Sequence, residues 1–328
     1  MEHRNCIKNR KAPLPISFRL FTFLLCVIAF FECQYLGVEI YATDEAEHFY
    51  IENLRKKQFN TTGIKTTKTL EHNETFTRYL IEYESDGLKI SGMMNIPKGE
   101  GQFPVVVLNH GYYDPKKFSV GLGFKDAADI FARNGYVAVG SDYRNNGNSD
   151  KGENFFQHIG SLYDVLNLVE AVKQLPYVDK QKVGMWGYSG GGWLTLKASV
   201  INRDIKAIAL FGSMSSDDKE NYYALEKWHP EVLKNVRKNL GKPEEGNEAY
   251  KLISPINYIK YMSNNVIIHH GVKDEAVPLK WSENLREALI RERKTVEFYA
   301  YPEQGHVLRG EAWDLSMERT VIFFKRFL

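Results

Sequence analysis

The chain has 328 residues, 43% of them apolar and 26% charged, which is typical of a folded globular protein and excludes a disordered or fibrous one. Its formal charge of +2 comes from the N-terminal end, because setting aside residues 1–33 leaves 38 basic and 39 acidic side chains. This near-neutral remainder argues against nucleic acid as a partner, and it contains no cysteine, which excludes a cysteine nucleophile or a cysteine-ligated zinc site there.

The first predicted element is a targeting segment. Five basic residues, the last of them Arg19, precede an uninterrupted and almost wholly apolar run at 20–31. Twelve residues are too few to cross a bilayer, which takes about 20, but they suit the core of a signal peptide. We therefore expect residues 1–42 to be a signal peptide or membrane anchor whose cleavage site the sequence does not mark. The protein would then be exported: secreted, periplasmic or membrane-anchored, with membrane contact only through this segment if it stays uncleaved.

Residues 43–76 are expected to form an N-terminal extension. Within it, residues 44–57 predict a short amphipathic helix and the Thr-rich residues 60–69 predict a link. Two stretches of alternating polarity follow, at 77–84 and 88–96, separated by a Ser-Asp-Gly turn. They predict an antiparallel pair of strands that leads into a sheet.

From residue 104 onward, short apolar runs alternate with helical patterns. Strands are predicted at 105–109, 136–141, 183–186, 207–211, 266–270 and 296–299, and helices at 124–134, 161–175, 191–201, 281–290 and 311–327. Strands and helices that alternate through short connections predict a mostly parallel sheet flanked by helices, an α/β-hydrolase domain over 77–328. Ser161 and Asp164 are expected to cap the start of the helix at 161–175.

One connection breaks this alternation. More than 50 residues separate the strands at 207–211 and 266–270, far more than an ordinary connection needs. The pieces 217–228 and 230–240 look helical, so we predict a helical cap at about 213–262. Its aromatic side chains either form the core of a small helical layer or line the substrate pocket.

A candidate nucleophile lies at a predicted junction between a strand and a helix. Gly187-Tyr188-Ser189-Gly190-Gly191 matches the pattern G-x-S-x-G. The chain must reverse direction within a few residues here, which projects the serine hydroxyl, and flanking glycines leave room for the close approach. The free N–H groups of the following helix point towards developing negative charge. Ser189 is therefore predicted to be the nucleophile.

A serine hydroxyl needs a base to take its proton, and the base needs an orienting acid. Asp274 follows the strand at 266–270 and His306 follows the strand at 296–299, so both lie at the carboxyl edge where such sheets place their sites. Glu275 competes for the role of the acid, but Asp274 fits the D-x-x-V-P spacing better. We predict a triad of Ser189, Asp274 and His306.

The third requirement is a pair of donors for the oxyanion. One is predicted to be the N–H of Gly190, and the other is predicted to come from the loop after the first parallel strand, with Tyr112 N–H favoured. The phenol of Tyr112 or Tyr113 is the alternative donor. His110 is expected to fix this loop by hydrogen bonds rather than to act as a base.

These segments together resemble a known family. His110-Gly111, Asp142-Tyr143-Arg144 with Gly147, the serine motif, Asp274 with Val277-Pro278, and Gly305-His306 are similar to the catalytic domain of the prolyl oligopeptidase (S9) family, and nearly as similar to dienelactone hydrolases and acetyl xylan esterases. The resemblance covers roughly residues 80–328. It implies an eight-stranded α/β-hydrolase sheet, a Ser-Asp-His triad and no cofactor.

Two departures from the S9 peptidases favour an esterase. Those peptidases carry a β-propeller before this domain, whereas only about 40 residues follow the export signal here, and their His-Gly-Gly-Pro loop is replaced by a loop that reads His-Gly-Tyr-Tyr. We expect a small-molecule ester as substrate, with a serine peptidase acting on short peptides as the alternative and a non-catalytic binding module as a third hypothesis. His269 and His270 suggest a metal site, but adjacent strand residues point to opposite faces, so we predict no metal.

Overall fold

The computed structural model describes residues 44–153 and 159–328. The signal peptide or anchor predicted at 1–42 lies outside the described residues and stays a prediction. Within the described ranges, no helix is both long and apolar enough to cross a membrane.

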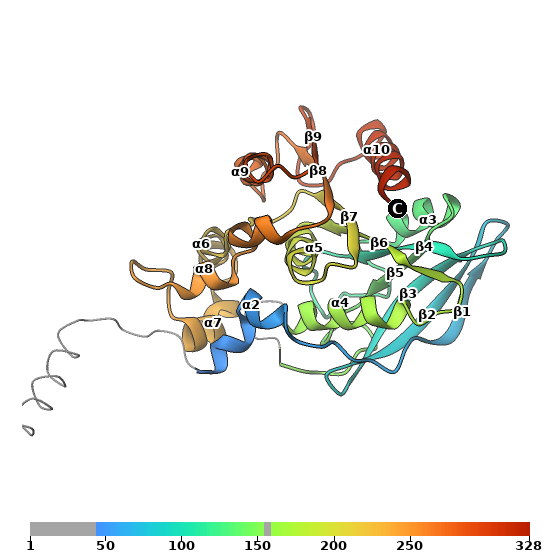
Figure 1. Cartoon of the computed structure of the whole chain (residues 1–328), viewed down its shortest axis with the longest axis horizontal. Coiled ribbons are helices and arrows are strands. Elements are labelled where there is room, and N and C mark those ends of the chain that lie inside the picture. The colour runs from blue at the N-terminus through green and yellow to red at the C-terminus, as the bar shows by residue number, and fades with distance from the viewer. Residues whose placement is uncertain (1–43, 154–158) are drawn as a thin grey trace, which may run out of the picture. The chain divides into compact units, whose positions relative to one another are not determined.

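A nine-stranded sheet forms the centre of the fold, in the order β1-β2-β3-β5-β4-β6-β7-β8-β9 (Figure 1). Its strands are β1 (Lys65–His72), β2 (Phe76–Ser85), β3 (Leu88–Pro97), β4 (Phe103–Asn109), β5 (Val137–Ser141), β6 (Val178–Tyr188), β7 (Ile205–Phe211), β8 (Asn265–Gly271) and β9 (Val296–Tyr301). The three pairings from β1 to β5 are antiparallel and the other five are parallel. The predicted α/β-hydrolase fold is confirmed, with nine strands instead of eight.

The additional strand is β1, at the edge of the sheet. It pairs antiparallel with β2, and its residues are almost all exposed. The predicted link over 60–69 was therefore wrong for residues 65–69, which belong to β1. Because neither face of β1 is buried, its sequence shows no apolar alternation, and its Lys and Thr side chains suit an exposed edge.

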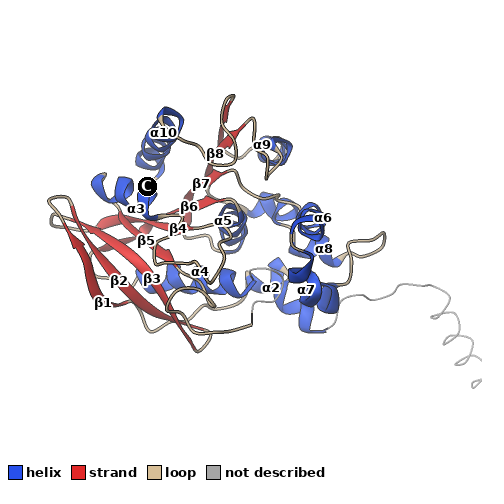
Figure 2. Ribbon diagram, turned by 180° about the vertical axis from the view of Figure 1, so that it is seen from behind, coloured by secondary structure: helices blue, strands red, loops and turns tan. Residues whose placement is uncertain are grey.

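Helices cover both faces of the sheet (Figure 2), and a hydrophobic core lies on each face. Val105 and Val107 of β4 belong to one core, while Val106 and Leu108 belong to the other, as the alternation of side chains along a strand requires. The first core includes residues of α4 (Ile159–Val172), α5 (Gly190–Ile201) and α9 (Leu279–Arg291), and the second includes residues of α3 (Lys125–Arg133) and α10 (Glu311–Phe327). Strands buried on both faces explain the continuous apolar runs in the sequence.

The segment predicted as a cap is helical. It contains α6 (Asp218–Trp228), η2 (Pro230–Val232), α7 (Leu233–Leu240), α8 (Ala249–Ile253) and η3 (Pro255–Tyr261). The short helices η1 (Asp44–Phe49) and α2 (Ile51–Leu54) pack beside it. Asp218 at the start of α6 accepts hydrogen bonds from Lys197 Nζ and Trp193 Nε1 of α5, both at 2.8 Å. This fully buried contact ties the cap to the helix that follows Ser189.

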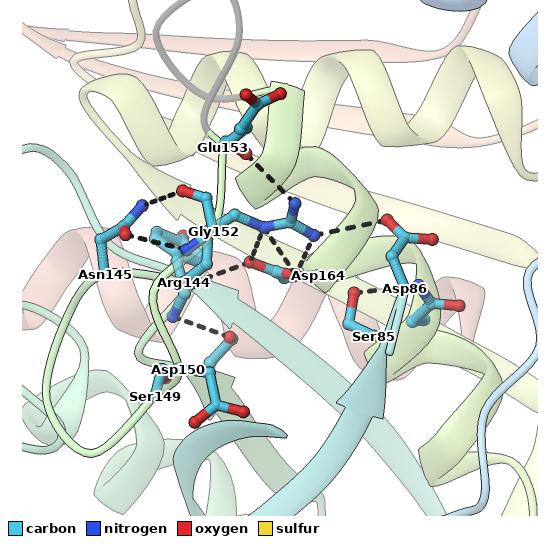
Figure 3. Close-up of polar contacts among 12 residues, drawn as sticks. Ser85, Asp86, Arg144, Asn145, Ser149, Asp150, Gly152, Glu153 and Asp164 are labelled. Carbon is cyan, nitrogen blue, oxygen red and sulfur yellow. Dashed lines mark hydrogen bonds and ion pairs between the residues drawn. The ribbon is translucent and has the colours of Figure 1, made fainter. Parts of the chain in front are cut away.

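A second buried ion pair ties the loop after β5 to α4 (Figure 3). The Arg144 guanidinium donates to both oxygens of Asp164, at 2.8 and 3.1 Å, and its backbone N–H donates to the same carboxylate at 2.8 Å. Arg144 also reaches Asp86 at 3.4 Å and the carbonyl oxygen of Glu153 at 3.2 Å. Burial raises the pKa of Asp164, and the bonds from Arg144 oppose that shift.

The predicted capping pair of Ser161 and Asp164 was wrong. The helix α4 already begins at Ile159, which places Ser161 inside it, and the carboxylate of Asp164 is engaged by Arg144. The capping pattern could not reveal this, because the partner comes from a loop 20 residues earlier in the chain.

Removing the arginine is expected to destabilise the protein. Arg144→Met leaves the Asp164 carboxylate buried without its counter-ion, which typically costs about 3–5 kcal/mol. Urea unfolding should therefore show a lower free energy of unfolding for the variant. The double variant Arg144→Met/Asp164→Leu is the control, since removing both charges should restore part of the loss. Equal stability of Arg144→Met and the unsubstituted protein would contradict this account of the pair.

Candidate active site

Ser189 occupies a sharp turn between β6 and α5. Its backbone is in a strained region, with φ 56° and ψ −121°, and its N–H donates to the carbonyl oxygen of Phe211 at 2.9 Å. A Cβ added at Gly191 would lie 2.0 Å from the carbonyl oxygen of Asn109, so only glycine permits this packing of α5 against β4. The local sequence therefore imposes the turn that projects the serine side chain.

The structure brings Ser189, His306 and Asp274 into one hydrogen-bonded chain. His306 Nε2 lies 3.0 Å from Ser189 Oγ, and His306 Nδ1 lies 2.8 Å from Asp274 Oδ2. In this arrangement the serine hydroxyl donates to Nε2 and the Nδ1–H donates to the carboxylate. The hydrogen-bond network therefore indicates that the neutral imidazole of His306 carries its proton on Nδ1. Such a chain can transfer the serine proton to the imidazole.

The loop after β8 holds the Asp274 carboxylate in place. Its Oδ1 accepts from the N–H groups of Ala276 and Val277, at 2.9 and 2.7 Å. Burial alone would raise the pKa of Asp274, but bonds from His270, His306 and the N–H of Val277 outweigh it and hold that pKa well below its ordinary value. Asp274 therefore carries a negative charge beside His306 at neutral pH.

Glu275 contacts the same histidine in a different way. Its Oε2 accepts from the backbone N–H of His306 at 3.2 Å, and among the described residues the imidazole of His306 bonds Ser189 and Asp274 and not Glu275. Of the two candidate acids, only Asp274 lies where it can orient the ring.

Two further residues that sequence reasoning missed shape this cluster. His270 Nε2 lies 3.2 Å from Asp274 Oδ2, and its Nδ1 lies 2.7 Å from Ser282 Oγ. Gly212 has φ 48°, and a Cβ there would lie 3.3 Å from His306 Nδ1 and 3.4 Å from Asp274 Oδ2. The signals in the sequence were that His270 lies near the end of β8, the strand before Asp274, and that Gly212 directly follows β7, the strand that comes after Ser189 in the chain.

The predicted oxyanion donors lie close to each other, next to Ser189. A Cβ added at Gly190 would lie 4.0 Å from the nitrogen of Tyr112, so the two backbone N–H groups are neighbours. Among the described residues, neither N–H donates a hydrogen bond to a protein acceptor. The Tyr112 ring instead extends outward to His229 of the cap, with ring centroids 5.2 Å apart. This geometry suits the backbone donors better than the phenol of Tyr112, and their role stays a prediction.

His110 contacts the loop after β4, which carries Tyr112. Its Nδ1 lies 2.7 Å from the carbonyl oxygen of Gly111, and its ring stacks on Tyr143 with centroids 4.2 Å apart. The Tyr143 hydroxyl donates to the carbonyl oxygen of His110 at 3.3 Å. Burial lowers the pKa of His110 to about 4, so the imidazole is neutral at pH 7. These contacts agree with the expectation that His110 fixes this loop by hydrogen bonds rather than acting as a base.

Two cavities meet at Ser189. The aromatic cavity, of 860 Å³, lies between residues 119–127 and 306–310, and Trp313 forms part of its wall. The cap cavity, of 710 Å³, lies between the loop at 110–113 and the cap and is lined by Leu225, Trp228 and residues 143–146. Both volumes lie in the range of small-molecule sites.

Some aromatic side chains of the cap form the core of the helical layer and others line a cavity, so both roles considered for them occur. Tyr222, Tyr250 and Tyr258 are buried in the core, whereas Trp228 and His229 line the cap cavity.

His269 and His270 lie on different faces of β8. The ring of His269 forms hydrogen bonds with the hydroxyl groups of Tyr301 and Thr320. The ring of His270 forms a hydrogen bond with the Ser282 hydroxyl and lies next to the Asp274 carboxylate. The described part of the chain contains no group of three His, Cys, Asp or Glu side chains placed to hold a metal ion.

Comparison with known families extends this description. The sequence model of the prolyl oligopeptidase family matches residues 123–328. Two relatives from Bacillus subtilis (strain 168) are both described as uncharacterized peptidases. The chain is 25% identical to YtmA over 231 residues, which cover 70% of this chain and 85% of the relative. It is 23% identical to YuxL over 296 residues, which cover 84% of this chain but only 42% of the relative.

Solved structures share the fold at low sequence identity. Acetyl xylan esterase 1 from Thermoanaerobacterium matches with a TM-score of 0.65 and 18% identity, covering 86% of this chain and 94% of the esterase. The acylaminoacyl peptidase from Pyrococcus horikoshii matches with a TM-score of 0.65 and 22% identity, covering 78% of this chain and 42% of the peptidase. The chain thus spans most of the esterase and less than half of the peptidase.

Proposed function

This chain belongs to the prolyl oligopeptidase family of serine hydrolases, and on that premise we propose that it cleaves carboxylic esters through an acyl-enzyme intermediate. The observation that carries the proposal is the unbroken chain of hydrogen bonds from Asp274 through His306 to Ser189. The N–H groups of Tyr112 and Gly190 support it further, because they donate to no protein acceptor among the described residues and free donors beside Ser189 could stabilise an oxyanion.

The residues would act in sequence. Ser189 Oγ attacks the ester carbonyl while His306 Nε2 takes its proton, and Asp274 stabilises the imidazolium that forms. The N–H groups of Tyr112 and Gly190 hold the negative charge of the tetrahedral intermediate. His306 then gives the proton to the departing alcohol oxygen, and water releases the acyl group by the same steps in reverse.

Esters are favoured over peptides for two reasons. The match covers 94% of acetyl xylan esterase 1 but only 42% of the Pyrococcus horikoshii acylaminoacyl peptidase. The oxyanion loop also carries Tyr112 and Tyr113 where the peptidases that the sequence resembles carry Gly and Pro. A serine peptidase acting on short peptides is the second candidate, and the family match and the likeness to YtmA favour it.

Paired substrates separate the two candidates. We expect p-nitrophenyl acetate and butyrate to be hydrolysed with a kcat/KM at least roughly 100-fold above that of aminoacyl and prolyl p-nitroanilides, which corresponds to a difference of about 2.7 kcal/mol in activation free energy. Comparable values for the two substrate classes would favour the peptidase. A fluorophosphonate probe should label Ser189 in the folded protein, and failure to label would point to a non-catalytic module.

A further inference from the structure

His270 lies between the catalytic acid and α9, and its side chain is fully buried. Its Nε2 lies 3.0 Å from the carbonyl oxygen of Val277 and 3.2 Å from Asp274 Oδ2. Both neighbours are acceptors, so this nitrogen carries a proton. At the other side of the ring, Nδ1 lies 2.7 Å from Ser282 Oγ, whose hydroxyl can donate to it. These contacts fix the ring with its N–H beside the carboxylate.

Backbone donors already hold the Asp274 carboxylate in place without His270. Oδ1 accepts from the N–H groups of Ala276 and Val277, at 2.9 and 2.7 Å. Oδ2 accepts from His306 Nδ1 at 2.8 Å, and the N–H of His270 lies beside the same oxygen. The two histidines therefore share one oxygen, and the contact with His270 changes the charge of that oxygen more than its position.

This shared oxygen affects how readily His306 takes a proton. The positive end of the His270 N–H offsets part of the negative charge on Oδ2, and the side chains of Asp274 and His270 are both 0% exposed, so water does not screen the effect. A full charge on Oδ2 would stabilise an imidazolium more strongly. His306 would then be protonated before the substrate arrives and could not take the serine proton.

We propose that His270 is a positioning residue that acts through Asp274: its N–H weakens the hold of Oδ2 on a protonated His306, so that His306 stays in its base form down to a lower pH. This inference rests on the proposed function and deepens it, because it assigns the pH range of the same site to a residue outside the triad.

Other titratable groups also surround His306. Glu275 accepts its backbone N–H, and the ring of Tyr188 at the end of β6 lies 5.0 Å from its ring. Burial raises the pKa of Tyr188, so the phenol stays neutral in an esterase assay. None of these groups is changed in the variants below, so a shift between variants reports the substituted residue. Charged or titratable side chains that line the two cavities beside His306 include Lys125, Asp126, Arg309, His229, Glu231 and Lys234.

The acidic limb of kcat/KM for p-nitrophenyl butyrate tests the proposal. This limb reports the protonation of His306 in the free protein. The amide of His270→Asn can still meet Ser282 but is too short to reach Asp274. We expect its limb to move to higher pH by roughly 0.5–1 unit, the shift that the loss of one polar contact can cause. The kcat above the limb should stay within about tenfold of the original value, whereas a merely structural role would lower kcat and leave the midpoint of the limb in place.

Two further variants serve as matched controls. The longer amide of His270→Gln can place an N–H beside Asp274, so its midpoint should return close to that of the unsubstituted protein. His269 is equally buried in β8 and bonds Tyr301 and Thr320 on the other face. His269→Phe should therefore leave the midpoint unchanged even if it lowers the melting temperature. If His270→Asn does not fold, His270→Phe is the second variant, since its ring fills the site without an N–H.

The rate at which a fluorophosphonate probe labels Ser189 gives the same midpoint without an ester substrate. If Ser189 is labelled but no ester is hydrolysed, the proposed function fails and the labelling rates still test the inference. If neither reaction occurs, both proposals fail. If esters are hydrolysed and the midpoint of His270→Asn is unchanged, lower than in the unsubstituted protein, or equal to that of His270→Gln, the inference is overturned and the esterase function stands.

Discussion

Ser189→Ala is expected to lower kcat for p-nitrophenyl butyrate by about 10⁴–10⁶-fold while the protein stays folded. The loss is large because the other groups of the site can only assist attack by Ser189 Oγ, and the variant offers no replacement nucleophile. The remaining rate should come from binding and from the oxyanion donors alone. Steady-state assays with the purified variant give the ratio, and its circular dichroism spectrum and melting temperature should match those of the unsubstituted protein.

A serine in α5, the helix that follows Ser189, provides the control. Ser199 donates its hydroxyl to the carbonyl oxygen of Leu196 at 2.7 Å and does not line either cavity at Ser189. Ser199→Ala should retain nearly full activity and react with a fluorophosphonate probe, whereas Ser189→Ala should not react. Labelling of a folded Ser189→Ala variant would show that the nucleophile lies elsewhere.

Asp274→Asn is expected to lower kcat by about 10³–10⁴-fold, although the side chain keeps its shape. The carboxylate accepts the Nδ1–H of His306 at 2.8 Å, which leaves Nε2 free to receive the serine proton. An amide can donate to Nδ1 instead, and the histidine would then carry its proton on Nε2 and could not act as a base. The kcat of the variant at pH 7 measures the effect.

The neighbouring acid gives a matched control for this substitution. Within the described part of the chain, Glu275 accepts a hydrogen bond from the backbone N–H of His306 alone, so Glu275→Gln should lower kcat by less than about tenfold, the effect of weakening one hydrogen bond. A larger loss for Glu275→Gln than for Asp274→Asn would assign the orienting acid to Glu275.

The same carboxylate should make stability depend on pH. The pKa of Asp274 in the folded protein is lower than its value of about 3.9 in an unfolded chain, so ionisation favours the folded state. That contribution is complete above about pH 4 and is lost as the pH falls through the folded pKa. The free energies of unfolding of the unsubstituted protein and of Asp274→Asn should therefore converge as the pH is lowered below 4.

The sequence by itself determined the parts of this protein that depend on neighbouring residues. Strands buried on both faces produce continuous apolar runs, so the alternation of strands and helices from β4 to α10 could be predicted. The turn at Ser189 is imposed by the adjacent glycines, and Asp274 and His306 each follow a strand whose carboxyl end must reach the same edge of a parallel sheet. These local rules brought the predicted triad to one place.

Only the tertiary structure decided the features that join distant segments. The strand β1 has no buried face and so leaves no alternation in the sequence. Asp164 is engaged by Arg144 instead of capping α4, and His270 meets Asp274 through the turn that follows β8. The two cavities are enclosed by segments more than 100 residues apart, such as 119–127 with 306–310. Which side chains become buried and how the cavity walls fit together depend on contacts between segments far apart in the sequence, and no local sequence pattern encodes these contacts.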